Sequence, residues 1–178
     1  MKKIVLTYGL IAGVISCLAM IITLIIGMDC VDGIWGMVLG FTGMIIAFSF
    51  IFVAVNKYRE KHGNGAISFG KAFLIGLLIS VIASTVYVSA WTFEHSFFVP
   101  DFMEKYSAGT IKQMQDSGVS ADVIAETQKE FDVMIENYKN PVYVFFSTYQ
   151  EILPVGILAS LLAAIILRRN RQAPLANT

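Results

Sequence analysis

The chain has 178 residues, of which 56% are hydrophobic and 15% charged, and its formal net charge is zero. Its mean hydropathy is +0.69, and its apolar residues fall in four runs of membrane length. These values exclude a soluble globular domain and a basic nucleic-acid-binding domain, and they indicate a multi-pass membrane protein.

The first apolar run covers residues 4–28 and contains no charged residue. A secretory signal peptide is one alternative, but this run is longer than a signal's apolar region and ends in Gly27-Met28-Asp29. A lipoprotein signal is another, since Val14–Cys17 loosely fits its cleavage motif, yet Leu18–Ile26 stays apolar after the cysteine. We therefore expect an uncleaved membrane span.

The next two runs predict a second span at 34–55 and a third at 72–93. An acidic turn, Asp29–Gly33, precedes the second span, and the polar residues 56–65 predict a short loop after it. Lys71 lies just before the third span, where its long side chain can reach lipid headgroups.

The one sizeable polar segment separates the third and fourth spans and predicts a hairpin of two amphipathic helices at 101–138. Gly118 suits the C-cap of the first helix, and Ser120 suits the N-cap of the second. The fourth span is predicted at 142–167. Residues 1–170 therefore read as a single all-α domain, a four-helix transmembrane bundle with a helical hairpin, followed by a disordered tail at 171–178.

Lysine and arginine distribution predicts the orientation. Basic residues gather at the N-terminus, in the loop after the second span and after the fourth span, where Glu60 is the one acid. The hairpin side is acidic. We expect both termini in the cytoplasm of a bacterium, the chain in its inner membrane and the hairpin outside.

Each predicted span carries small residues spaced about four apart, as close helix packing in lipid requires. They are Gly9 and Gly13; Gly36, Gly40 and Gly43; Gly76, Ser80 and Ser84; and Gly156, Ser160 and Ala164. This pattern favours a compact bundle over four independent anchors.

Glu151 is the strongest candidate for a functional residue, since an acid within a membrane span is a functional-site hypothesis by default. At about 1.5 Å per residue it lies about 25 Å along the helix from Arg168, just inside the outer boundary. Helical geometry places it away from the ridge of Gly156 and Ser160. The alternative is an interfacial glutamate that reaches the outer surface.

Glu94 and His95 are expected near the same depth, so Glu151, Glu94 and His95 form a candidate ion or polar site. Their spacing is not specific for a metal, and we expect no metal site, no cofactor and no catalytic residue. Motifs for phosphate loops, zinc-binding histidine pairs and nucleophiles are absent from the sequence. Trp35, Trp91, Tyr143 and Tyr149 fit an outer aromatic belt.

Several stretches carry a family resemblance: Ile67–Phe73 with the span that follows, Pro100–Lys105, Met114–Gly118 and Glu151–Gly156. Through them nearly the whole chain resembles a bacterial family of four-span inner-membrane proteins known as a domain of unknown function. The resemblance implies the architecture and a bacterial origin, and it implies no activity.

The function expected from the sequence is that of a non-enzymatic scaffold or interaction module. Its expected partners are the lipid bilayer, a membrane or periplasmic protein bound through the hairpin, and a second copy of the chain; no nucleic acid is expected. The alternative is a small transporter or ion-binding protein that uses Glu151. An intramembrane enzyme ranks last, because the spans lack a catalytic pair.

Overall fold

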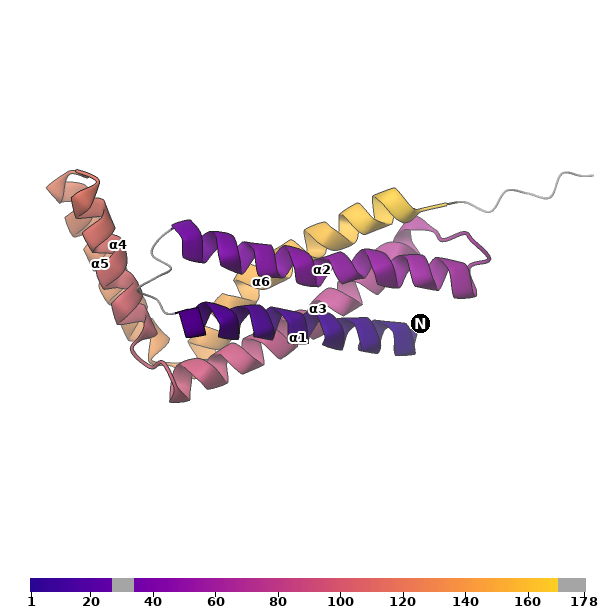
Figure 1. Cartoon of the computed structure of the whole chain (residues 1–178), viewed down its shortest axis with the longest axis horizontal. Helices are drawn as coiled ribbons and strands as arrows, with labels where there is room; N and C mark the ends of the chain where they lie inside the picture. The colour runs from indigo at the N-terminus through magenta and orange to yellow at the C-terminus, as the bar shows by residue number, and fades with distance from the viewer. Residues whose placement is uncertain (27–33, 170–178) are drawn as a thin grey trace, which may run out of the picture.

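The structure is a computed structural model that describes residues 1–26 and 34–169 (Figure 1). The predicted acidic turn at Asp29–Gly33 and the tail at 171–178 lie outside the described residues. Six α-helices make up nearly all of the described chain, which contains no β-strand. They are α1 (Lys2–Ile26), α2 (Ile34–His62), α3 (Phe69–Phe97), α4 (Phe102–Asp116), α5 (Ala121–Tyr138) and α6 (Pro141–Leu167).

Helices α1, α2, α3 and α6 are long and apolar enough to cross a membrane, which confirms the predicted all-α fold with four spans. They run along the long axis of the molecule, and α4 and α5 form a hairpin set steeply across one end (Figure 1). We call this the hairpin end. The start of α1, the α2–α3 loop and the end of α6 lie together at the other end, which we call the basic end.

The loop predicted at 56–65 was placed too early, because α2 continues to His62. Side chains across this last part of the helix support one another. The Asn56 amide donates to Glu60 at 2.9 Å, and the Arg59 guanidinium donates to the Asn56 side chain. Arg59 also donates to the Leu167 carbonyl at 3.3 Å, which ties the end of α2 to the end of α6. These polar contacts make a helix out of residues that composition alone assigns to a loop.

The turn between α4 and α5 and the caps of the helices lie where the sequence predicts them. Gly118 has a φ of +72°, and the Gly118 and Val119 N–H groups each donate at 3.0 Å to carbonyls of the last turn of α4. This is the left-handed ending that favours glycine. Ser120 precedes α5 as its N-cap, without a side-chain capping bond, whereas the Asn140 side chain accepts from the Val142 N–H at 3.0 Å to cap α6.

Helices α3 and α6 cross through the predicted small residues. A Cβ added at Gly76 would lie 2.8 Å from Ser160, and one added at Gly156 would lie 2.7 Å from Ser80. Each glycine thus receives the serine of the opposite helix. The two serine hydroxyls are 3.1 Å apart and fully buried, and Phe48 of α2 closes over them. Close backbone approach of this kind is what holds helices together in lipid.

Small residues also seat α1 against its neighbours. An added Cβ at Gly9 would meet Ile82 at 2.8 Å, and one at Gly13 would meet Val86 at 2.8 Å. Gly43 faces Ala19 in the same way. Gly40 is the exception to the predicted ridges, because an added Cβ there meets nothing within 4 Å. Of Gly36, the remaining glycine of that predicted ridge, the structure describes the helical backbone alone.

Candidate functional site

A cleft of about 210 Å³ opens in the half of the bundle nearer the hairpin end. Residues of all six helices line it, and the absence of a neighbour at Gly40 is part of that opening. The volume is below the range of about 300–1,000 Å³ that drug-sized ligands need, so the cleft suits a ligand of few heavy atoms. The α3–α6 crossing lies deeper in the bundle, where side chains fill the space.

Glu151 lines this cleft from α6, ten positions after the helix begins at Pro141. It remains exposed while Gly156 and Ser160 of the same helix are buried, which confirms that it lies off the packing ridge. Its carboxylate therefore stands where the cleft opens. No described residue forms an ion pair with it or donates a hydrogen bond to it.

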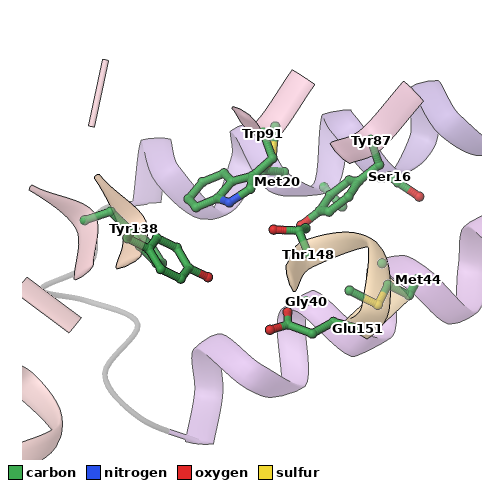
Figure 2. A pocket seen from close by; sticks show the side chains of 12 residues that line it. Ser16, Met20, Gly40, Met44, Tyr87, Trp91, Tyr138, Thr148 and Glu151 are labelled. Atoms are coloured by element: carbon green, nitrogen blue, oxygen red, sulfur yellow. The ribbon is translucent and has the colours of Figure 1, made fainter. Parts of the chain in front are cut away.

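Aromatic side chains make up much of the opposite wall. Tyr87 and Trp91 come from α3, Phe102 from α4 and Tyr138 from the end of α5. Trp91 and Phe102 meet edge to face, with ring centroids 4.8 Å apart and an interplanar angle of 80°. Figure 2 shows the Glu151 carboxylate and the Tyr138 hydroxyl pointing into the space that Tyr87 and Trp91 close from the other side.

Trp91 corrects one prediction. The sequence places it in an outer aromatic belt, but its side chain is 8% exposed and packs with Met20 and Val144 inside the bundle. It forms a wall of the cleft, where Phe102 at the start of α4 packs edge to face against it. A single sequence does not contain that information, because it arises from where the hairpin lies.

Two hydroxyl groups also line the cleft, Ser16 from α1 and Thr148 from α6. Ser16 is 3% exposed, and its Oγ has no hydrogen-bond partner among the described residues. A buried hydroxyl left unpaired costs free energy of about 1–3 kcal/mol, so a partner arriving in the cleft would recover part of this cost.

The other two predicted site residues lie outside this cleft. His95 is 6% exposed, with its ring centroid 5.9 Å from Trp91 and 5.5 Å from Tyr138. Its Nε2 has no partner in the described part of the chain. Glu94 is half-buried one residue earlier on α3. The structure therefore does not gather Glu151, Glu94 and His95 into one ligand set, and no three His, Cys, Asp or Glu side chains among residues 1–26 and 34–169 could hold a metal together.

The pKa of Tyr138, which lies on α5 outside the membrane-spanning helices, responds to the environment of the cleft. Burial raises the pKa of its hydroxyl, and the negative charge of Glu151 raises it further. A hydrogen bond with Ser147 acts in the opposite direction on this pKa, so the net effect favours the neutral hydroxyl.

The sequence predicts Glu151 as a candidate site residue, but it does not predict the other residues that line the cleft. Tyr87 is the missed residue with the clearest signal, because it sits well inside a predicted span instead of at an interface where tyrosine anchors are expected. Ser16 and Thr148 carry no such signal, since hydroxyl side chains are common in membrane helices. Together the residues form an acid at the edge of a small aromatic cage, with hydroxyl groups at its sides.

The family model of a protein family of unknown function, DUF4199, matches residues 7–169, and the chain belongs to this family. No curated protein matches the chain. No solved structure matches it either. This match confirms the resemblance seen in the sequence.

Proposed function

We propose that this chain is a non-enzymatic membrane protein that binds a small organic cation in the cleft at its hairpin end. One observation carries the proposal: the unpaired Glu151 carboxylate faces a wall formed by Tyr87, Trp91 and Tyr138 (Figure 2). A carboxylate at the mouth of an aromatic cleft in a membrane span favours a positive partner. Among the described residues the chain supplies none.

The aromatic residues favour an organic cation over a hydrated metal ion. A quaternary or alkylated ammonium group is attracted to the faces of tryptophan and tyrosine rings and has little to lose on leaving water. A divalent metal instead needs several oxygen or nitrogen ligands, and Glu151 is the one carboxylate on the walls. The Ser16 and Thr148 hydroxyls can accept or donate hydrogen bonds to the remainder of the ligand.

Binding of tetramethylammonium to the purified full chain in lipid nanodiscs tests this proposal by calorimetry. We expect saturable binding that Glu151→Gln weakens by about tenfold or more, because the neutral amide removes the charge and keeps the shape. Glu94→Gln is the matched control, since it removes an acid near the same end that does not line the cleft. Absence of binding by the unaltered chain, or equal losses in the two variants, would contradict the proposal.

Transport is the further step that this binding site supports. The α3–α6 crossing, with Ser80 and Ser160 fully buried, closes the cleft toward the basic end, so passage requires that crossing to open. Uptake of radiolabelled tetramethylammonium into proteoliposomes measures it directly. Uptake that Glu151→Gln abolishes indicates a transporter, and binding without uptake indicates a receptor or binding protein.

A scaffold role is the second candidate, and the surface of the hairpin supports it. Apolar side chains on α5 remain uncovered, with Val123 47% exposed and Val133 63% exposed. A membrane or periplasmic protein, or a second copy of the chain, can cover them. Val133→Glu should then remove a co-purifying partner and leave tetramethylammonium binding intact. An unchanged set of co-purifying proteins would count against the scaffold role.

The proposed location is the inner membrane of a bacterium, with the basic end in the cytoplasm. The excess of lysine and arginine at that end supports this orientation. A single cysteine introduced at Val119 in a Cys17→Ser, Cys30→Ser background tests it, because the hairpin tip should react with an impermeant thiol reagent added outside the inner membrane. Protection of that cysteine would reverse the orientation.

A further inference from the structure

We infer that the basic end carries a separate binding site for a phosphate group, independent of the cation cleft. A second cavity, of about 330 Å³, lies there between the end of α2, the loop before α3 and Arg169, the second residue after α6. Side chains of Tyr58, His62, Ser68, Lys71 and Arg169 line it. These residues come from three segments far apart in the sequence, which meet at this end of the molecule (Figure 1).

Backbone hydrogen bonds fix the geometry of the cavity. The Ile67 N–H donates to the Arg169 carbonyl at 3.0 Å, and the Arg169 N–H donates to the Ile67 carbonyl at 3.0 Å. This bridge holds Arg169, the second residue after α6, against the loop before α3. Asn64, at a φ of 49°, and Gly65, at a φ of 80°, turn the chain sharply between α2 and α3. Arg169 and Lys71 are thereby held at one cavity despite their distance in sequence.

Positive charge in this cavity is not balanced within the described chain. The two ion pairs of the described residues, Lys105 with Asp101 and Lys139 with Glu136, both belong to the hairpin end. Glu60, the acid nearest in sequence, accepts instead from the Asn56 amide. Arg59 is occupied in donating to the Leu167 carbonyl, so it differs from Lys71 and Arg169, which remain exposed.

The aromatic side chains of the cavity contact Lys71. Lys71 Nζ lies 5.7 Å from the centroid of the Tyr58 ring, and Tyr58 stacks on His62 with centroids 4.9 Å apart and an interplanar angle of 11°. Tyr58 is buried, and its ring faces the ammonium group of Lys71 at the cavity. The cavity also adjoins the beginning of α3, where the helix dipole is positive.

A phosphate group is the ligand that this arrangement fits. Arginine binds phosphate oxygens through two parallel N–H bonds, and lysine adds a point charge. Since α3 begins its membrane span at Phe69, the cavity lies at the depth of lipid headgroups. The phosphate can belong to an anionic lipid or to a soluble phosphate, because both present the same oxygens.

Two binding measurements on the full chain distinguish these sources. In the first, phosphatidylglycerol and phosphatidylcholine that remain bound after purification from mixed micelles are quantified. In the second, inorganic phosphate is titrated into the chain in phosphatidylcholine nanodiscs. We expect the double variant Lys71→Gln, Arg169→Gln to lose binding by about tenfold or more in whichever measurement detects it, since each basic residue contributes to attraction of an anion. Lys71→Arg keeps the charge and should retain binding.

The matched control is the double variant Lys3→Gln, Lys61→Gln, which removes two exposed charges from the same end without touching the cavity. Retained phosphatidylglycerol that only the cavity variant loses assigns the site to a lipid headgroup. Saturable inorganic phosphate binding that only this variant loses assigns it to a soluble phosphate. Equal losses in the two double variants, or no binding in either measurement, would overturn the inference.

Discussion

Helices α3 and α6 contribute both to their own crossing and to the cleft at the hairpin end, yet the crossing is sealed and the cleft is open. At the crossing, Gly76 and Gly156 each leave room for a serine of the opposite helix, and that room is filled. In the cleft, Gly40 leaves room that no described side chain enters. A glycine in a membrane helix thus has two opposite uses: it permits contact where a partner is near, and it preserves a void where none is.

Helix α6 shows the division within one element. Gly156 and Ser160 face the crossing, whereas Glu151 turns toward the cleft on another side of the same helix. The sealed region holds the spans together, and it leaves the region toward the hairpin free to part around a ligand. Stability and binding are therefore expected to respond to different substitutions.

The largest difference in stability is expected between alanine substitutions of a glycine at the crossing and of a glycine in the cleft. Gly156→Ala places a Cβ 2.7 Å from Ser80 and 3.0 Å from Phe48, so the helices must separate. We expect it to lower the free energy of unfolding by about 1–3 kcal/mol. Gly40→Ala meets nothing and should raise stability by roughly 0.5–1 kcal/mol, because alanine favours the helix. Circular dichroism during unfolding in mixed micelles measures both, and similar effects would erase the distinction between the regions.

Sequence reasoning identified the crossing better than the cleft for a physical reason. A crossing depends on one face of each helix, and that face is visible as small residues spaced four apart, such as Gly76 and Ser80. The cleft depends on how six helices are placed around a space, which no single helix encodes. Glu151 stands out in the sequence because a charge in a span is costly by itself. The outer aromatic belt predicted for Trp91 is wrong because its burial depends on contacts with other helices, such as that with Phe102, which the sequence does not show.

The buried serines should sharpen the comparison with a smaller effect. The Ser80 hydroxyl lies 3.1 Å from Ser160 and donates to the Gly76 carbonyl at 3.0 Å. Ser80→Ala should therefore cost about 0.6 kcal/mol of stability, the usual scale of a hydrogen bond between membrane helices. Ser16→Ala removes a hydroxyl that has no described partner, so stability should stay constant or rise. Tetramethylammonium binding should stay unchanged, because that cation forms no hydrogen bond with a hydroxyl. Equal stability losses would mean that Ser16 is satisfied in the folded protein.

The smallest expected effect is a titration at the mouth of the cleft. Burial first, and the charge of Glu151 second, raise the pKa of Tyr138 above its ordinary value. Because the folded chain favours the neutral hydroxyl, this tyrosine stabilises the fold up to the unfolded pKa of about 10, and that contribution diminishes as the pH rises further.

Glu151→Gln should lower the pKa of Tyr138 only in part, since burial remains as the larger cause. The difference in ultraviolet absorbance between the chain and its Tyr138→Phe variant, followed from neutral to alkaline pH, isolates this tyrosine from the others. The same difference in a Glu94→Gln background is the control and should not move. An unchanged pKa of Tyr138 in Glu151→Gln would mean that the carboxylate does not interact with the aromatic wall. The cleft would then be, like the crossing, a region of packing alone.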